Sequence, residues 1–458
     1  MSTYLRHSWQ WASSKERRGL IAVLGGALLV RLLVAPYHGF VIDLQDYVTW
    51  GLLVDHHFLH IYSLSSGAPV YALPNYPPLA MYLYGLMTGL YFGAAQLVGI
   101  HASSQVANEP LLSAWIKLPA ILADLGAVWL LYRLARSVLP ERTVLLAAAS
   151  YAFSPAIVFD GAFWGETDAL SLLPLLLALL FAARRRGIWA GILFGVAIML
   201  KPQPVIFAPL LLLYLWRWAG RRQAISALGA LCLVSLVCCA PYLLPPRPEL
   251  LALYQNTSIW ARVGHASDGA FNLWWLLDAG HSATAAYLGS LSPTSIGYAL
   301  FLAIELLALI GVWRDGSEQR LFLGAALVAL AFFVVAPLQH ERYLYPALAL
   351  FLIAGFSQKR SRWFYVVASI TAFCNMVIVL VINSPDFAVH PGFWQNVVLQ
   401  HLAVVTFTTI GLALVNIVLL LAVITAYLRS GRGPANPSIA AASPLALSSA
   451  VTTPDPPY

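Results

Sequence analysis

Residues 320–360 read RLFLGAALVALAFFVVAPLQHERYLYPALALFLIAGFSQKR, and this stretch decides the fold class. It contains two apolar runs, 321–338 and 343–358, each close to the length that crosses about 30 Å of hydrocarbon as an α-helix. Basic residues flank the two runs at their far ends, whereas the polar group QHER lies between them. The stretch therefore predicts a pair of membrane-crossing helices that begins and ends in the cytoplasm.

The composition of the whole chain extends this prediction. Of its 458 residues, 60% are hydrophobic and only 10% are charged, whereas a soluble domain carries about 25% charged residues. A surface so poor in charge has to face lipid, and the period-2 alternation typical of barrels is absent. We predict an all-α polytopic membrane protein with about 12 or 13 transmembrane helices.

The distribution of charge predicts the topology. Most of the 26 Lys and Arg residues fall into seven clusters, which we place in the cytoplasm by the positive-inside rule. The clusters occupy residues 6–18, 133–142, 184–186, 217–222, 314–320, 359–362 and 429–432. Pairs of apolar segments join successive clusters, but the first interval holds three segments: 19–37, 77–99 and 112–132. Either one of these segments dips into the membrane and returns, or the cluster 133–142 violates the rule. The segment 77–99 opens with two prolines and is rich in Gly and Tyr, so we expect it to be the one that dips in and returns.

Three regions follow from this topology. We expect residues 1–18 to form a cytoplasmic N-terminus and residues 19–430 to form the transmembrane domain. Residues 431–458 are rich in Pro, Ser and Ala and are expected to be a disordered cytoplasmic tail. Most acidic side chains outside the basic clusters then fall at the non-cytoplasmic face. Charges near membrane depth are costly, so this gathering predicts a functional site there.

The first outer loop, residues 38–76, carries two candidate catalytic residues, Asp43 and Asp46. Asp43, Tyr47 and Trp50 are spaced i, i+4, i+7, so one helix face can carry all three, with Asp46 on the same side. A carboxylate at the mouth of a cavity is suited to act as a general base or as a metal ligand, although DLQD is not the DxD pattern of a metal clamp. Trp50 is a candidate substrate contact. The alternative is that Asp43 caps a helix and that the aromatic residues lie at the membrane interface.

Two further segments lie at outer helix ends, WGETD (164–168) and KPQ (201–203). Their candidate substrate-binding residues are Trp164, Glu166, Asp168, Lys201 and Gln203. Trp164 beside a glycine suggests a flat ring against a close backbone, an arrangement suited to sugars. The alternatives are that the two acids cap the next helix at its N-terminus and that Lys201 extends to the membrane interface.

The segment HERY, at the start of the apolar run 343–358, is the most specific local signal. Arg342 offers a rigid fork for a phosphate, and His340 adds a hydrogen-bond donor; Glu341 and Tyr343 complete the candidate substrate-binding group. The alternative is a capped helix start. The motif HExxH is absent and the four cysteines lie in apolar runs without metal-ligand spacing, so no metal site is predicted.

The longest outer loop, residues 245–295, includes NTSIWARVGHASDGAFNLWWL (256–276). Arg262 is a candidate substrate-binding residue in this loop. The aromatic residues fit either a membrane belt or a platform for sugar rings. Asn256 opens a glycosylation sequon, which matters only in a eukaryotic secretory compartment.

Together these segments resemble the GT-C superfamily of membrane glycosyltransferases. More narrowly, the chain is similar to bacterial mannosyltransferases related to the enzyme that adds the second mannose in GPI-anchor assembly. The resemblance covers about residues 20–385. It rests on Asp43 with Tyr47 and Trp50, NYPPL (75–79), WGETD (164–168), KPQ (201–203), FNLWW (271–275) and HERYLYP (340–346).

The chain also resembles, more distantly, the ER glucosyltransferases that use dolichyl-phosphoglucose. Those relatives carry an Asp seven residues before a Trp, as Asp43 and Trp50 stand here, and a Lys where this chain has Arg342. The resemblance implies a GT-C fold with short outer helices and Asp43 as the catalytic base. It leaves Asp46 as an orienting or competing residue. It also implies a polyprenyl-phosphate sugar as donor, with no metal or other cofactor required.

We therefore expect a glycosyltransferase that moves a hexose, mannose by the narrower resemblance, to a hydroxyl of a lipid-linked or glycan acceptor. The reaction is an inverting displacement at the periplasmic face of a bacterial inner membrane. The expected partners are the donor, the acceptor and membrane lipids, but no nucleic acid, because the basic residues are accounted for by topology.

Two alternatives remain at the level of sequence. A secondary transporter or a lipid-linked glycan flippase needs ionisable residues within its spans, for which Lys117, Asp124 and Glu305 are candidates. Many transporters are also built from repeated halves, and no repeat is visible here. A polymerase or ligase of cell-surface glycans is the other enzymatic alternative.

Overall fold

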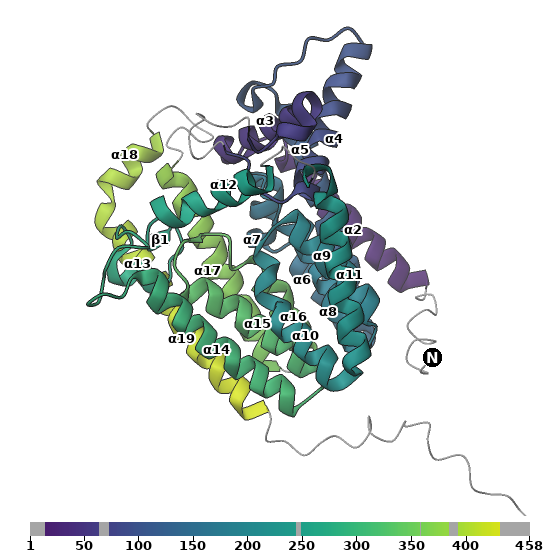
Figure 1. Cartoon of the computed structure of the whole chain (residues 1–458), viewed down its shortest axis with the longest axis vertical. Coiled ribbons are helices and arrows are strands. Elements are labelled where there is room, and N and C mark those ends of the chain that lie inside the picture. Colours follow the sequence, from purple (N-terminus) through teal and green to yellow (C-terminus); the bar gives the residue numbers. More distant parts are fainter. Residues whose placement is uncertain (1–13, 64–72, 244–248, 358, 384–392, 431–458) are drawn as a thin grey trace, which may run out of the picture.

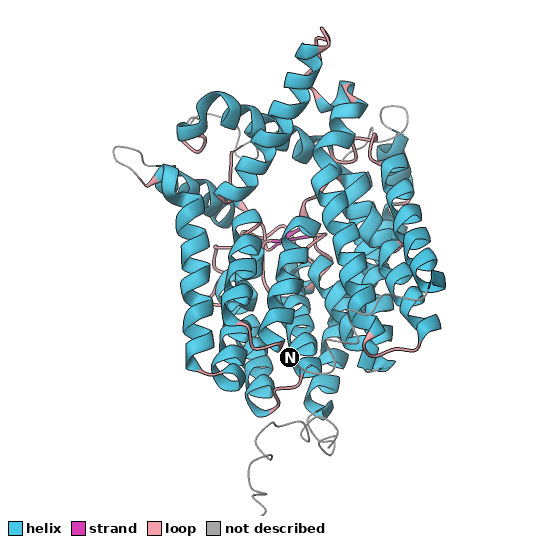
Figure 2. Cartoon of the chain, turned by 90° about the vertical axis from the view of Figure 1, so that its right-hand side faces the viewer, coloured by secondary structure: helices cyan, strands magenta, loops and turns pink. Residues whose placement is uncertain are grey.

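The computed structural model of the chain describes residues 14–63, 73–243, 249–357, 359–383 and 393–430. These residues form a bundle of helices with a smaller group of helices at one end (Figures 1 and 2). The expected disordered tail, 431–458, and residues 1–13 of the expected N-terminal region lie outside the described residues. The prediction of an all-α polytopic membrane protein is confirmed.

The first half of the chain contains α2 (Ser14–Val34), α3 (Val41–His57), α4 (Pro78–Leu97), α5 (Pro110–Arg136), α6 (Glu141–Ala152), α7 (Pro155–Val158), α8 (Asp168–Ala183), α9 (Gly187–Leu200), α10 (Ala208–Tyr214) and α11 (Arg221–Cys239). The second half contains α12 (Glu249–Val263), α13 (Leu273–Asp278), α14 (Pro293–Arg314), α15 (Glu318–Val335), α16 (Tyr345–Ser357), α17 (Lys359–Asn383), α18 (Phe393–Gln400) and α19 (Leu402–Ser430). Short 3₁₀ turns are η1 (Phe58–His60), η3 (Val106–Asn108), η5 (Gln203–Phe207) and η7 (Ala240–Tyr242), and π-helical turns are η4 (Phe159–Trp164) and η6 (Leu215–Ala219).

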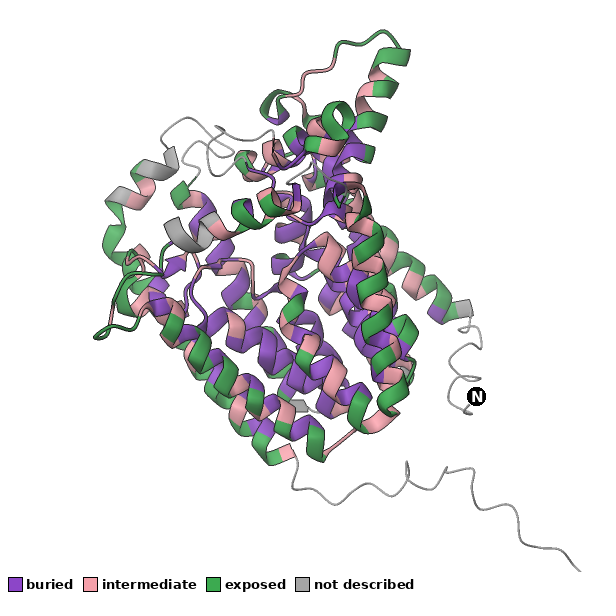
Figure 3. Cartoon of the chain, viewed as in Figure 1, coloured by how far each residue is buried: buried purple, intermediate pink, exposed green. Residues whose placement is uncertain are grey.

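Six helices of the described residues are long and apolar enough to cross a membrane, or seven if the pair bent by 42° between α6 and α7 is one span. The apolar helices α8, α9 and α16 are shorter, with 16, 14 and 13 residues. The predicted number of about 12 or 13 crossings exceeds the number of long helices because polar outer ends and π-helical turns interrupt several apolar segments. α15 is almost wholly buried at the centre of the bundle, whereas α11 and α19 expose Leu and Val along their length (Figure 3).

The middle apolar segment of the first interval, 77–99, is largely α4. It packs along α3 and projects beyond the end of the bundle (Figures 1 and 2). The expectation that it dips into the membrane and returns stays a prediction. Glycines allow this close packing: a Cβ at Gly51 would lie 2.6 Å from the Tyr84 carbonyl oxygen, and one at Gly85 would lie 2.5 Å from a Val54 methyl. The small-residue face of α4 therefore packs on α3, and α4 also contacts α5 and α9 of the bundle.

The basic clusters gather at the end of the bundle opposite α3 and α4. Contacts between residues in or next to them are Glu16 with Arg136 at 3.3 Å, Gly187 N with Gln223 Oε1 at 2.7 Å, Trp218 Nε1 with the Val312 carbonyl at 2.8 Å, and Arg320 with Ser430 Oγ. We call this the basic end and the opposite end the site end. The clustering of basic loops at one end agrees with the charge topology read from the sequence.

Candidate active site

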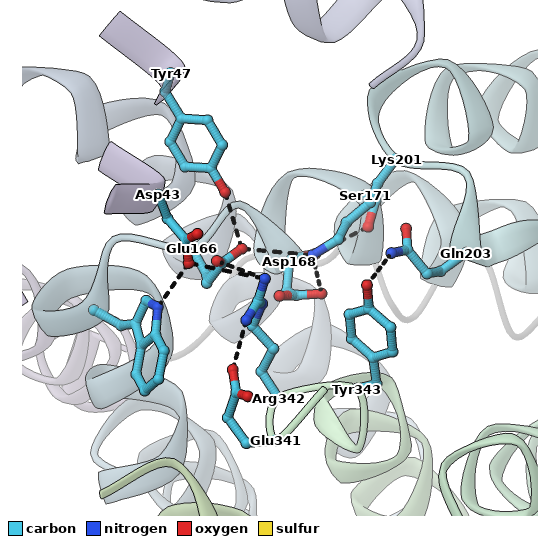
Figure 4. Close-up of polar contacts among 11 residues, drawn as sticks. Asp43, Tyr47, Glu166, Asp168, Ser171, Lys201, Gln203, Glu341, Arg342 and Tyr343 are labelled. Atoms are coloured by element: carbon cyan, nitrogen blue, oxygen red, sulfur yellow. Dashed lines mark hydrogen bonds and ion pairs between the residues drawn. The ribbon is translucent and has the colours of Figure 1, made fainter. Parts of the chain in front are cut away.

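Four segments that are far apart in the sequence meet at the site end of the bundle (Figure 4). The first turn of α3 brings Asp43, and the turn between η4 and α8 brings Glu166. The residue after α9 is Lys201, and the turn between β2 and α16 brings Arg342. The expected convergence of the first outer loop, WGETD, KPQ and HERY is confirmed by the ion pairs among these four side chains.

Arg342 lies at the centre of this group. Its Nη2 is 3.0 Å from Glu166 Oε1 and 3.9 Å from Asp43 Oδ2, and its Nη1 contacts Glu341. Burial raises the pKa of Glu166, but the charges of Arg342 and Lys201 outweigh burial and lower the pKa to about 2. Glu166 is therefore ionised at neutral pH and holds the guanidinium in place. The Nε of Arg342 is buried and has no hydrogen-bond partner among the described residues, so one N–H is left to donate to a ligand.

Lys201 is the second buried cation. Its Nζ lies 2.8 Å from Asp168 Oδ1 and 3.7 Å from Glu166 Oε2, and its side chain is only 1% exposed. Lys201 therefore does not extend to an interface. Asp168 is the first residue of α8, where the helix dipole favours an acid, as the alternative expected. Its carboxylate also pairs with Lys201, whereas Glu166 lies before the helix.

Asp43 is held from a neighbouring segment. Trp164 Nε1 donates to Asp43 Oδ2 at 3.0 Å, and the Asp43 side chain remains 21% exposed. Burial, followed by the Glu166 carboxylate, raises the pKa of Asp43 well above its usual value, although Arg342 opposes the shift. A carboxylate with a raised pKa is a stronger base.

Asp46 lies one turn further along α3 and is half-buried. Burial alone raises its pKa to about 7, with no contribution from a neighbouring charge among the described residues. Asp43 lies 3.9 Å from Arg342 and accepts a hydrogen bond from Trp164, and neither contact is found for Asp46 among the described residues.

The position of Trp164 depends on the glycine that follows it. Gly165 has φ +101°, in the left-handed region, which favours glycine because it has no Cβ. A Cβ at Gly165 would lie 2.4 Å from Leu44 Cδ2 and 2.9 Å from Lys117 Cε. The expected close backbone beside Trp164 is therefore present, but the indole is only 2% exposed and binds Asp43.

The remaining residues of HERY form the wall beside Arg342. His340 lies in β2 (Gln339–His340), a two-residue strand that pairs in parallel with β1 (Ser267–Asp268) of the long outer loop. Burial, followed by the charge of Arg342, lowers the pKa of His340 to about 4, so the imidazole is neutral at physiological pH. Tyr343 stacks edge-on against His340 and accepts a hydrogen bond from Gln203 Nε2 at 3.0 Å.

The structure places Trp50 away from the charged group. Its side chain is 3% exposed and packs edge-on against Tyr47, with ring centroids 5.7 Å apart. Tyr47 is the residue of this helix face that reaches the site, where its hydroxyl donates to Glu166 Oε2 at 3.0 Å. The i, i+4, i+7 spacing predicted that Asp43, Tyr47 and Trp50 share one helix face. It did not predict that Tyr47 contacts Glu166 while Trp50 packs behind Tyr47.

Two expectations for the long outer loop have different outcomes. Arg262 lies in α12, and its side chain is outside the described residues. Asn256 is 9% exposed, and its Nδ2 donates to the Tyr62 and Pro74 carbonyls. The Asn256 amide is buried and already hydrogen-bonded to two backbone carbonyls. Asn256 therefore packs in the interior and does not offer its side chain for glycosylation.

An apolar pocket opens beside the charged group. Asp168, Ser171, Gln203 and Tyr343 line it near the site end. The rest of the lining is Leu172 and Leu175 of α8, Pro204, Ile206 and Phe207 of η5, Ala329 and Phe332 of α15, and Pro346 of α16. The pocket therefore runs from the buried ion pairs into the apolar interior of the bundle.

From the sequence, Lys117 is a candidate ionisable residue of a transporter. In the structure it binds backbone carbonyls instead. Its Nζ donates to four backbone carbonyls, those of Ala35, Tyr37, Ala162 and Phe163. It thereby joins the end of α2 to the π-helical turn η4, just before Trp164. A Lys within an apolar run is unusual, and this made Lys117 noticeable in the sequence. No sequence pattern identifies the backbone carbonyls that it binds.

Within the part of the chain that the structure describes, no group of three or more His, Cys, Asp or Glu side chains is arranged to hold a metal ion. The positive charges of the site are those of Arg342 and Lys201.

Comparison with known proteins supports a class of enzyme. Residues 100–244 match the family described as dolichyl-phosphate-mannose-protein mannosyltransferase, over less than half of the chain. This segment includes WGETD and KPQ but neither Asp43 nor HERY. No curated protein matches the chain. With the helical bundle, the match supports a multi-pass membrane glycosyltransferase of the GT-C type that uses a polyprenyl-phosphate sugar.

Proposed function

We propose that this protein transfers a hexose from a polyprenyl-phosphate sugar to an acceptor hydroxyl at the site end of the bundle. The observation that carries the proposal is the 3.9 Å approach of Asp43 to Arg342. It places a candidate general base beside a candidate phosphate-binding cation. Both side chains are partly exposed, at 21% and 11%, so a substrate can reach them.

The proposed reaction is a single inverting displacement. The acceptor oxygen forms a bond to the anomeric carbon while the bond from that carbon to the phosphate oxygen breaks. Asp43 takes the hydroxyl proton, and the phosphate leaves with the bonding electron pair. Arg342 and Lys201 stabilise the charge that develops on the phosphate. General-base assistance of this kind contributes about 10²–10⁴-fold to the rate.

Glu166 and Asp168 are proposed to position the two cations rather than to react. Glu166 contacts Arg342, and Asp168 contacts Lys201, so each ammonium or guanidinium is oriented before the donor arrives. Such preorganised charge needs little rearrangement during the reaction. The proposed step therefore takes its positive charge from Arg342 and Lys201 and requires no metal ion.

The apolar pocket supports a lipid-linked donor. Asp168 is one of its lining residues, and Lys201 is 2.8 Å from Asp168, so a phosphate held by Lys201 would lie beside the pocket. The lipid chain of the donor would then begin next to the apolar side chains of Leu172, Leu175 and Ala329. Burial of an alkyl chain contributes about 0.8 kcal/mol for each CH₂, so contacts with this lining would add to the affinity for the donor.

The finer assignments are proposals of the same kind. We propose mannose as the sugar, a relation to the second mannosyltransferase of GPI-anchor assembly, and a lipid-linked or glycan acceptor. The basic end is proposed to be cytoplasmic, which puts the site on the periplasmic face of a bacterial inner membrane. The positive-inside rule supports this orientation.

The arrangement of polar groups favours an enzyme over the alternative of a transporter or flippase. The candidate substrate-binding charges converge at one end of the bundle. Two of the three ionisable residues within spans have protein partners: Lys117 binds backbone carbonyls, and Asp124 pairs with Arg31 at 3.3 Å. Glu305, the third, is buried in α14.

The direct test is to incubate the purified full-length protein, in lipid nanodiscs, with polyprenyl-phosphate mannose, glucose and arabinose in turn. Extracted membrane lipids and glycans from a bacterial envelope serve as acceptors, and mass analysis follows the products. We expect released polyprenyl phosphate and one hexosylated product with mannose. If no donor is consumed while labelled donor lipid crosses between bilayer leaflets in proteoliposomes, the transporter alternative replaces this proposal.

A further inference from the structure

Behind the site, a second buried polar cluster joins four helices near the middle of the bundle. Asp124 of α5 is its centre and is fully buried. Asp124 Oδ2 pairs with Arg31 Nε of α2 at 3.3 Å, and Asp124 Oδ1 accepts hydrogen bonds from Tyr345 at 2.6 Å and Tyr151 at 3.2 Å. A charge buried among apolar helices is costly unless it is paired, so these bonds are strongly favoured in the fold.

One of these bonds connects directly to the site. Tyr345 is the first residue of α16, three residues after Arg342. Its hydroxyl donates to Asp124, and its backbone N–H donates to the Arg342 carbonyl at 2.8 Å. The turn that carries the guanidinium is therefore attached, through one residue, to the buried carboxylate.

Asp124 also lies against the other arm of the site. A Cβ at Gly161 would lie 3.4 Å from Asp124 Oδ2, so the π-helical turn η4 passes close to the same carboxylate. This turn leads to Trp164, which binds Asp43, and to Glu166, which pairs with Arg342. The Asp124 carboxylate therefore lies next to two segments, the turn from Arg342 to Tyr345 and the turn η4. Side chains from both segments flank the proposed base, Asp43.

We propose that Asp124, through Tyr345, is a positioning residue that holds Arg342 in the geometry that receives the leaving phosphate. The role in transfer rests on the proposed function, whereas the effect on the Arg342 turn does not. A phosphate-binding guanidinium has to be placed within a fraction of an ångström to stabilise a transition state. A hydrogen bond to a buried, fixed anion provides such a constraint on the turn.

The chain offers a matched pair of variants to test this. Tyr345→Phe and Tyr151→Phe each remove one hydroxyl from the same Asp124 oxygen and keep the ring. Each also removes the 3.3 Å contact between the two hydroxyls, so this loss is common to both variants. Only Tyr345 is bonded to the Arg342 segment. The Asp124–Arg31 pair remains in both variants, which limits the risk that either fails to fold.

The first measurement needs no substrate. Hydrogen–deuterium exchange of the peptide covering 340–346 is compared between the two variants in nanodiscs. We expect exchange about tenfold faster than wild type in Tyr345→Phe and within about twofold of wild type in Tyr151→Phe. Equal exchange in the two variants would overturn the proposal, whether or not the protein transfers sugar.

The second measurement separates positioning from general stability. With donor and acceptor at hand, we expect Tyr345→Phe to lower kcat about tenfold with little change in KM, and Tyr151→Phe to change kcat less than about twofold. In the Arg342→Lys background, the effect of Tyr345→Phe should shrink, because the group that it positions has already been replaced. A Tyr345→Phe effect of the same size in both backgrounds would show that Tyr345 does not act through Arg342. An inactive wild type would refute the proposed function and leave the exchange result to decide the positioning role.

Discussion

Trp164 Nε1 donates a hydrogen bond to Asp43 Oδ2 at 3.0 Å, which joins the first outer helix to the turn that carries Glu166. The proposed base is thus held by a residue 121 positions away in the chain. This contact, with the Arg342 ion pair, defines which carboxylate of α3 is part of the site.

The central prediction concerns Asp43. Asp43→Asn should abolish transfer while leaving donor affinity largely intact, because Asn keeps the size of the side chain but cannot accept a proton at neutral pH. The measurement is single-turnover transfer paired with donor-lipid binding. Asp46→Asn is the control on the same helix face and should have a milder effect. Transfer by Asp43→Asn at more than about a tenth of the wild-type rate would be incompatible with a general-base role, and exchanged results for the two variants would make Asp46 the base.

The pH dependence of transfer should report the Trp164 hydrogen bond. This bond lowers the pKa of Asp43 against the larger effect of burial, because it stabilises the carboxylate. Trp164→Phe should therefore raise that pKa and move the acidic limb of the kcat/KM profile to higher pH. Trp50→Phe is the control, since Trp50 is equally buried but packs on Tyr47. An unchanged limb in Trp164→Phe would show that the bond does not tune the base.

Replacement of Arg342 should distinguish phosphate recognition from a structural role at the helix start. Arg342→Lys keeps the charge but removes the rigid fork and the Nε donor, so we expect a partial loss of about tenfold or more in kcat/KM. Arg320→Lys is the control, because Arg320 is a buried cation at the basic end that binds Tyr427 and Ser430. Turnover equal to wild type at limiting donor would show that Arg342 only begins the helix.

The backbone at Gly165 makes a prediction about stability. Gly165→Ala adds a Cβ at φ +101° that would collide with Leu44, so we expect destabilisation of about 1–3 kcal/mol and loss of activity. Gly99→Ala is the matched control: Gly99 has φ +74°, and nothing lies within 4 Å of its Cβ position. Both glycines have a positive φ, so both variants carry the cost of placing Ala in that conformation. The difference between their melting temperatures therefore reports the collision with Leu44 alone. Equal melting temperatures would show that the contact with Leu44 relaxes freely.

The apolar pocket predicts a dependence on the length of the donor lipid. Ala329→Phe should partly fill the pocket and weaken binding of a long-chain polyprenyl-phosphate sugar about tenfold or more, because the chain loses buried surface. A donor with a ten-carbon chain should be affected much less. Ala325→Phe, one turn earlier on α15 at another buried alanine outside the pocket lining, controls for general disruption of the helix. Equal losses for long and short donors would place the lipid chain elsewhere.

The sequence predicted much of the candidate site as a set of residues. Acids and cations that remain at the non-cytoplasmic ends of apolar segments are rare, and each of Asp43, Glu166, Lys201 and Arg342 could be found by that criterion. The pairings among them could not be predicted, since they join residues up to about 300 positions apart. Trp50 shows this limit: its spacing from Asp43 resembles a family motif, yet Tyr47 is the aromatic residue that contacts Glu166.

Hydropathy and charge by themselves determined the class of protein, the helical segments, the end of the bundle at which the basic loops lie, and the end at which a site was to be sought. These properties follow from the free energy of transfer of each segment between water and lipid, which depends on local composition. Only the tertiary structure decided that α4 packs on α3, that Lys201 is buried in ion pairs, and that Asp43 rather than Asp46 meets Arg342. Those outcomes depend on how side chains from distant helices fit together, a property of close packing that no single segment contains.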